Sequence, residues 1–318
     1  MLGSVKIDKL NFGFRSVNIE KIEAVKKVVK RYYDKVYYSG DGKNYNHLYL
    51  SITPTKQLRE PDYNSENNHN LQMVPLNEFL KFLKELNEVA DCKIDVYEMH
   101  LAKDITTEDS VITYLDTILN HEYTNGYKAF TNEADSSNTV YVGKSTGKLD
   151  SKRNPKLLIK FYDKATEMIN HNNVNRVPVI KEPLSCKDIP TDKVNGNDVI
   201  LLYKMNLLRV EIELRKNNLP YKTIQEMIKA IENGTFQDTL ENTYSKVMSN
   251  IVFAEPKEVS CKTLKELAIT LSRNSKIDYE LLFYNQGMHR EYRYYKSAKE
   301  IKNRENDFVF DELKDKLL

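Results

Sequence analysis

The chain has 318 residues, 40% of them apolar and 30% charged; this allows one large domain or two modest ones around a real core, and it excludes a small disulfide-stapled fold and wholesale disorder. The formal net charge of +2 does not indicate a nucleic-acid partner, so any basic surface must be local. Three widely spaced cysteines fit no disulfide framework or paired zinc motif, and without a long apolar run or a signal-peptide pattern we expect a soluble cytoplasmic protein with no membrane partner.

The first part of the chain alternates between strand and helix patterns. Residues 5–14 and 47–52 alternate apolar and polar side chains, as half-buried strands do, and residues 22–32 repeat apolar side chains at helical spacing. The proline- and asparagine-rich stretch 53–70 predicts a surface connection. An amphipathic helix is predicted from Pro75 onward, because proline suits the first turn of a helix.

The remainder of the chain continues this alternation and then becomes helical. The expected elements are strands at 93–105, 139–143, 157–162 and 206–215, helices at 111–119, 166–170 and from 224 onward, and a long exposed loop at 171–198. Strands interleaved with helices through irregular connections favour an α+β fold with a mainly antiparallel central sheet and flanking helices. We therefore expect a sheet domain over residues 1–218 and a helical C-terminal region over residues 219–318.

Familiar nucleotide and metal motifs are incomplete. Residues 143–145, Gly-Lys-Ser, resemble the end of a P-loop, but Asn138 replaces its first glycine and the residues between are β-prone, so we expect a strand. The six histidines show no zinc-ligand spacing. Glu98 and His100 would lie on one face of a strand, about 6.6 Å apart. That pair could share an ion, although an ordinary exposed strand face has the same pattern.

The segment Tyr-Asp-Lys-Ala-Thr-Glu at 162–167 places a tyrosine where an apolar strand meets a helix. A phenol attacks poorly at neutral pH unless a cation stabilises the phenolate, and Lys164 could supply that charge. Ordinary packing, in the core or at the surface, explains most single tyrosines equally well. The spacing alone therefore leaves both interpretations of Tyr162 open.

Residues 208–215, Leu-Arg-Val-Glu-Ile-Glu-Leu-Arg, predict a strand with four charges on one face. Glu211 and Glu213 could hold Mg²⁺ or Mn²⁺, and Arg209 and Arg215 could contact a phosphate group. Cross-strand charge pairing on a solvated face is the alternative.

A local basic stretch lies near the C-terminus, at residues 289–304, where six basic residues and three tyrosines accompany two acids. Such a mixture suits phosphate and base contacts, and it predicts that Arg290, Arg293 and Lys296 bind DNA. A solvated helix face gives the same count.

Taken in order, these segments resemble the rolling-circle replication initiators of small Gram-positive plasmids, the Rep_trans family, and more distantly the filamentous-phage gene II nickases and other HUH-like tyrosine endonucleases. The four motifs that carry the resemblance are Leu-Ala-Lys-Asp-Ile at 101–105, Val-Tyr-Val-Gly at 140–143, Tyr-x-Lys-x-x-Glu at 162–167 and Arg-Val-Glu-Ile-Glu-Leu at 209–214. The resemblance covers about residues 93–220. It implies an HUH or ferredoxin-like sheet and a site-specific DNA nicking and closing enzyme.

By this resemblance Tyr162 is the nicking nucleophile and Lys164 assists it. A catalytic Mg²⁺ or Mn²⁺ would be held by Asp104, Glu211, Glu167 and, as a further candidate, His100. One phosphodiester is exchanged for another, which leaves the 5′ end on the protein and needs no ATP. The implied partners are origin DNA, single-stranded or extruded as a hairpin, a host helicase, and a second copy of the chain in a homodimer. Arg209 and Arg215 would then contact the DNA.

The chain departs from the family pattern at two positions. Ala102 stands where the family has arginine, and Lys103 where it has an apolar residue. The missing arginine keeps open a catalytically inactive origin-binding or copy-control protein. A mobilisation relaxase, which shares the chemistry, and a generic α+β protein are further alternatives.

Overall fold

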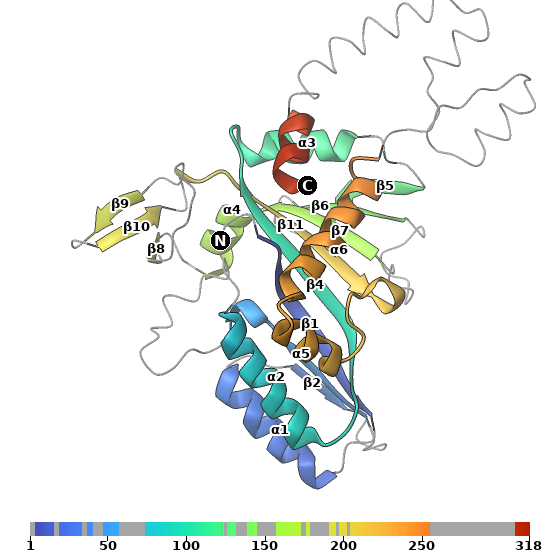
Figure 1. Cartoon of the computed structure of the whole chain (residues 1–318). Coiled ribbons are helices and arrows are strands. Elements are labelled where there is room, and N and C mark those ends of the chain that lie inside the picture. The colour runs from blue at the N-terminus through green and yellow to red at the C-terminus, as the bar shows by residue number, and fades with distance from the viewer. Residues whose placement is uncertain are drawn as a thin grey trace, which may run out of the picture.

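The structure, a computed structural model, is built around one large antiparallel sheet (Figure 1). It describes residues 4–15, 19–33, 37–40, 47–56, 74–121, 123, 126–131, 139–144, 157–172, 176–178, 191–194, 197–201, 204–254 and 309–318. Within them, eight strands follow the order β2-β3-β1-β4-β11-β7-β6-β5. Their bounds are Lys6–Arg15 (β1), Tyr37–Gly40 (β2), His47–Ile52 (β3), Ile94–Thr106 (β4), Tyr127–Thr131 (β5), Thr139–Lys144 (β6), Leu157–Asp163 (β7) and Leu207–Arg215 (β11). The predicted class, α+β with an antiparallel central sheet, is confirmed.

A second, three-stranded sheet lies to one side of the first in Figure 1. Its strands are Arg176–Pro178 (β8), Thr191–Val194 (β9) and Asn197–Leu201 (β10), in the order β8-β10-β9. The prediction of a loop over 171–198 is therefore wrong in part. These strands of three to five residues are too short to show a clear two-residue periodicity. By contrast, Gly143 and Lys144 lie in β6, as expected of a segment that is no P-loop.

Helices cover the sheet and its ends. Their bounds are Ile19–Tyr32 (α1), Leu76–Ala90 (α2), Val111–Asn120 (α3), Lys164–Asn172 (α4), Ile224–Glu232 (α5), Phe236–Ile251 (α6) and 309–317, with short 3-10 turns at Pro54–Lys56 (η1) and Lys216–Asn218 (η4). Figure 1 shows α1 and α2 side by side, α5 and α6 in front of the sheet, and α3 at the opposite end from α1. Among the described residues, no helix combines the length and apolar composition that a bilayer crossing requires.

The hydrophobic core lies between the sheet and these helices. Period-two alternation buries Val210 and Ile212 of β11 in it, and α2 adds Phe79 and Leu83 at helical spacing. Leu240 of α6, beyond the predicted domain boundary at residue 218, belongs to the same core cluster. Among the described residues that boundary therefore does not separate two cores.

The helix at 309–317 is also part of this core. Leu313 and Leu317 are fully buried, and the backbone oxygen of Leu317 accepts a 3.3 Å hydrogen bond from Lys103 Nζ. Lys316 Nζ donates to the carbonyl of Thr106 at the end of β4, at 2.8 Å. Residues 255–308, which include the predicted DNA contacts near residue 290, lie outside the described part of the chain.

The face of the sheet opposite the core, called the polar face below, receives two extra side chains from β-bulges. In the pairing of β1 with β4, the register skips Asp8 on one strand and Tyr97 on the other. A bulge places two consecutive residues on the same side of a strand. Asp8 and Lys9 therefore share the polar face, as do Tyr97 and Glu98.

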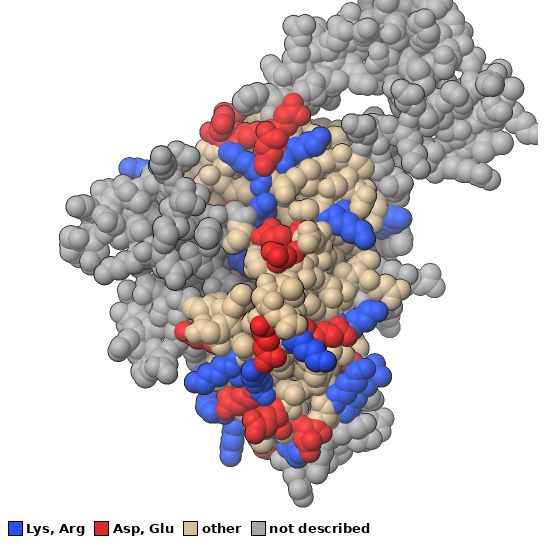
Figure 2. Space-filling view, in the orientation of Figure 1, with Lys and Arg blue, Asp and Glu red and all other residues tan. Residues whose placement is uncertain are grey.

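Charge on the helix-covered side gives no indication of a nucleic-acid surface. Figure 2 shows acidic and basic side chains interspersed over the described part of this side. This pattern agrees with the small net charge of +2.

Candidate functional site

The polar face brings four of the predicted site residues into two neighbouring cross-strand rows. One row consists of Thr139, Tyr162, Arg209 and Asp104, and the adjacent row of Tyr141, Lys160, Glu211 and Ala102. Residues two apart on a strand are separated by about 6.6 Å. The predicted nucleophile in the first row and the predicted ligand Glu211 in the second are therefore close neighbours.

Asp104 and Arg209 form a buried ion pair in the first row. Arg209 is fully buried, and its Nε and Nη2 donate to the two carboxylate oxygens of Asp104 at 2.5 and 2.8 Å. Lys6 also contacts Asp104 through Nζ, and Arg209 Nη1 lies 3.1 Å from Asp8 Oδ1. The positive charges of Arg209 and Lys6 thus balance the negative charges of Asp104 and Asp8.

The pKa values show that this network is charged at neutral pH. Burial would raise the pKa of Asp104, but Arg209 and Lys6 together hold it well below its usual range. Burial is also the largest influence on the pKa of the Lys6 ammonium, and it lowers this pKa to about 8. A metal-ligand role for Asp104, or a phosphate contact by Arg209, therefore requires this buried ion pair to be broken first.

Tyr162 lies next to this network and is partly buried. Burial raises the pKa of its phenol well above the usual value; Arg209 acts in the opposite direction, whereas Glu211, Asp8 and Glu167 raise the pKa further. Two of the predicted ligands, Glu211 and Glu167, are thus near enough to act on the phenol electrostatically. Because the phenol is protonated at neutral pH, nucleophilic attack needs a proton acceptor or a nearby cation.

Lys164 and Glu167 occupy the first turn of α4. Asp163 caps that turn, since its carboxylate accepts hydrogen bonds from the Thr166 amide at 2.9 Å and the Thr166 hydroxyl at 2.8 Å. This cap helps to end β7 and begin the helix immediately after Tyr162. The Lys164 side chain is 1% exposed, and its Nζ lies 2.5 Å from Glu167 Oε2. Burial lowers the pKa of Lys164.

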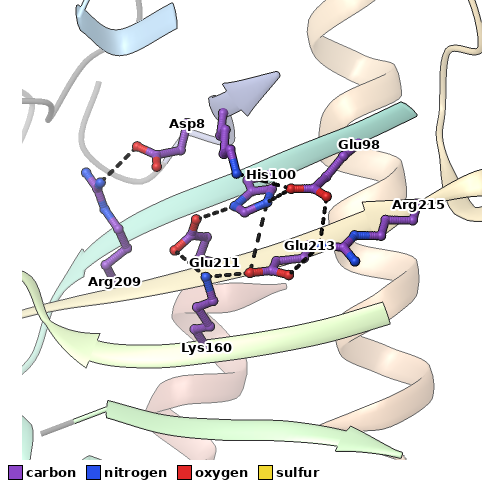
Figure 3. Close-up of polar contacts among 9 residues, drawn as sticks. Asp8, Glu98, His100, Lys160, Arg209, Glu211, Glu213 and Arg215 are labelled. Atoms are coloured by element: carbon purple, nitrogen blue, oxygen red, sulfur yellow. Dashed lines mark hydrogen bonds and ion pairs between the residues drawn. The ribbon is translucent and has the colours of Figure 1, made fainter. Parts of the chain in front are cut away.

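His100 lies between two glutamates on the polar face (Figure 3). Its Nδ1 is 2.7 Å from Glu211 Oε1, and its Nε2 is 2.8 Å from Glu98 Oε1. Burial would lower the pKa of the imidazole, but hydrogen bonds to the two carboxylates raise it to about 9. His100 is therefore a cation at neutral pH, and both of its nitrogens donate.

The polar face holds three neighbouring glutamates, Glu98, Glu211 and Glu213, which are called the carboxylate cluster below. Two further cations, Lys160 and Arg215, contact this cluster. Lys160 Nζ lies 2.5 Å from Glu213 Oε1 and 3.9 Å from Glu211 Oε2. Arg215 Nη2 is 2.7 Å from Glu98 Oε2, and the Arg215 side chain is 23% exposed. The cluster is thus neutralised by protein side chains, as the alternative of cross-strand charge pairing predicts.

A divalent cation fits this arrangement only in part. His100 and Glu211 are in contact, whereas Asp104 is held by cations in the other network and Glu167 by Lys164. In the part of the chain that the structure describes, no three His, Cys, Asp or Glu side chains are arranged to hold a metal ion. Cation binding at His100 and Glu211 requires the imidazole to lose its proton first.

Two contributors to the site, Asp8 and Lys160, were not predicted. The position of Asp8 could have been predicted from a break in the alternation of apolar and polar residues, because two polar residues between Ile7 and Leu10 indicate a bulge. Lys160 occupies a polar position in an otherwise apolar strand, which is a weaker signal. Of the predicted DNA contacts, Arg209 is fully buried.

Comparison with models of known protein families finds no match, and comparison with curated protein sequences finds none either. The four motif segments meet on adjacent strands, in the order β4-β11-β7-β6. They come from widely separated parts of the chain, so their convergence is a property of the fold.

Proposed function

We propose that the protein is a site-specific DNA nicking and closing enzyme that initiates rolling-circle replication of a plasmid or phage. The observation that supports this most is the position of Tyr162, at a strand-to-helix corner on the polar face and within the electrostatic influence of Arg209, Glu211 and Glu167. The four adjacent motif strands agree with an HUH-like sheet. Origin DNA is the substrate, and the C-terminal region contacts DNA or a partner such as a helicase or a second copy.

The reaction needs only an exchange of phosphodiesters. The Tyr162 oxygen bonds to phosphorus while the bond to the 3′-oxygen breaks, and the 5′ end stays on the protein as a phosphotyrosine. Glu167, another carboxylate that acts on the phenol, accepts its proton, and the departing 3′-oxygen takes up a proton from solvent. A Mg²⁺ or Mn²⁺ at Glu211 and His100 would supply Lewis-acid polarisation of the phosphate. The new ester resembles the old one in energy, so the strand can be rejoined without ATP.

A DNA-binding protein without catalysis is the second candidate, and specific contacts favour it. Asp104 and Arg209 neutralise each other in the buried network. Burial holds the Tyr162 phenol protonated, and His100 and Lys160 occupy the carboxylate cluster as cations. Such a protein would bind the origin and control copy number without cutting.

Incubation with Mn²⁺ and a single-stranded origin library, followed by denaturing gel electrophoresis, separates the two candidates. For the nicking enzyme we expect a covalent protein–DNA adduct that EDTA prevents and that Tyr162→Phe abolishes. Tyr141→Phe, the same chemical change in the adjacent row of the polar face, should leave the adduct in place. Binding without an adduct supports the second candidate, and an adduct with Tyr162→Phe refutes the role of this tyrosine.

A further inference from the structure

We propose that Tyr49 and Tyr97 form a platform on which an unstacked base of single-stranded DNA rests. The inference rests on the proposed function, because the platform holds the strand that Tyr162 would cut. Both tyrosines lie on the polar face, toward the end of β4 that is remote from Asp104. They make no contribution to the chemistry assigned above.

The rings of Tyr49 and Tyr97 are unusually exposed for large apolar side chains. Tyr49 is 42% exposed and Tyr97 39% exposed, and their ring centroids are 5.5 Å apart. The other exposed large apolar side chains in the described residues are Leu76, Ile112 and Leu318, none of which is aromatic. An exposed aromatic pair offers the flat surface on which a nucleobase stacks, whatever its sequence.

Backbone features explain why the rings lie there. Tyr97 is the extra residue of a bulge, which turns its side chain to the polar face beside Glu98. Gly13 pairs with Tyr49 in the neighbouring strand, and a Cβ at Gly13 would come within 1.9 Å of Tyr97 Cε2. The missing side chain lets the Tyr97 ring lie close against the sheet. A purely structural role, in which the Tyr97 ring covers Gly13, would explain the position of Tyr97. It would not explain why the ring of Tyr49 is exposed.

Charge near the platform favours a polyanion. Arg15 forms an ion pair with Asp95, which pairs across the strands with Gly13, the residue that the Tyr97 ring covers. The ion pairs around the rings are Arg15 and Lys93 with Asp95, and Lys9 and Arg215 with Glu98. Arg215 also lies 3.7 Å from Glu213, so four cations face three carboxylates. The side chains of Arg15 and Lys93 are 58% exposed, so they can also reach phosphates.

The separation of the platform from Tyr162 suits a short single strand. From Tyr97 to Asp104, β4 advances by seven residues, or about 23 Å at roughly 3.3 Å per residue. Asp104 lies in the same cross-strand row as Tyr162. A strand crossing the polar face between the two would span several nucleotides, as in single-strand sites of roughly 4–16 nucleotides.

Fluorescence anisotropy with labelled dT20 tests the platform without catalysis. Every protein would carry Tyr162→Phe and contain no metal, so that covalent attachment does not contribute. We expect Tyr49→Ala and Tyr97→Ala each to weaken binding roughly 5- to 150-fold, whereas Tyr49→Phe keeps its ring and its affinity. Ile112→Ala removes a 52% exposed side chain from α3 and should change nothing. Far-ultraviolet circular dichroism checks that each variant is folded.

Photo-crosslinking of the unsubstituted chain to dT20 that contains 5-iododeoxyuridine gives an independent readout. We expect the crosslinked base on Tyr49 or Tyr97. The inference is overturned if the Tyr162→Phe parent does not bind dT20, if both alanine variants bind like the parent, or if rU20 binds more tightly than dT20. Binding that depends on the platform, without an adduct at Tyr162, would overturn only the nicking function. An adduct at Tyr162, together with unaltered DNA binding by the alanine variants, would overturn only the platform.

Discussion

Replacing His100 by glutamine should remove a large part of the pH dependence of folding stability in mildly alkaline solution. His100 lies between Glu98 and Glu211, and Glu213 approaches its Nε2 to 4.0 Å. Its folded-state pKa is raised to about 9. A group with a raised folded-state pKa stabilises the protein fully below its unfolded pKa, and this contribution is lost as the pH rises through the folded pKa.

The size of the effect follows from the shift. A rise from 6.5 to about 9 corresponds to about 3 kcal/mol at roughly 1.36 kcal/mol per pKa unit. Only 6% of the His100 side chain is exposed, so solvent screening reduces this little. Lys6, with a pKa lowered to about 8 by burial, contributes in the opposite direction, but it is present in both proteins and cancels in their difference.

Urea denaturation of the wild-type chain and His100→Gln at pH 6 and pH 9.5 measures this difference. We expect the free energy of unfolding of the wild type to fall by about 3 kcal/mol more than that of the variant over this interval. Equal pH dependence of the two proteins would refute the assignment of a buried imidazolium to the carboxylate cluster.

Three further substitutions test the two networks and the C-terminal helix. Asp104→Asn leaves Arg209 buried without its carboxylate and should lower the free energy of unfolding by about 3–5 kcal/mol; a loss below about 1 kcal/mol in urea denaturation would show that the buried pair contributes little. Leu313→Ala should cost about 2–5 kcal/mol in the same assay, because Leu313 is fully buried, whereas no change would mean that the helix does not belong to the core. Glu211→Gln removes a residue that would hold the metal ion and should slow adduct formation by about 100-fold or more in a gel time course, with Glu213→Gln as the matched control; equal rates for these two variants would contradict a specific role for Glu211.

Long periodic elements were predictable from the sequence, and they define the sheet. The strand expected at 206–215 is observed at Leu207–Arg215, and the one at 93–105 at Ile94–Thr106. Their alternation of buried and polar positions extends over many residues, so local periodicity is sufficient. The short edge strand Tyr37–Gly40 was missed, because four residues show little periodicity and depend on pairing with a neighbour.

The candidate site was predictable only where one strand contains all of its residues. The shared face of Arg209, Glu211 and Glu213 followed from alternation, but the pairing of Arg209 with Asp104 depends on the register between two strands 105 residues apart in sequence. Tyr97 reaches the polar face only through a bulge. Strand register and bulges are set by tertiary contacts, so they are not determined by local pattern.

The most direct test is to identify the residue that carries DNA after reaction with Mn²⁺ and a single-stranded origin. Nuclease trimming of the adduct, trypsin digestion and mass spectrometry would place the remaining nucleotide among the 21 tyrosines of the chain. We expect it on the phenolic oxygen of Tyr162 and on no other residue. A nucleotide on a different side chain, or no modified peptide at all, would contradict a nicking reaction at the end of β7.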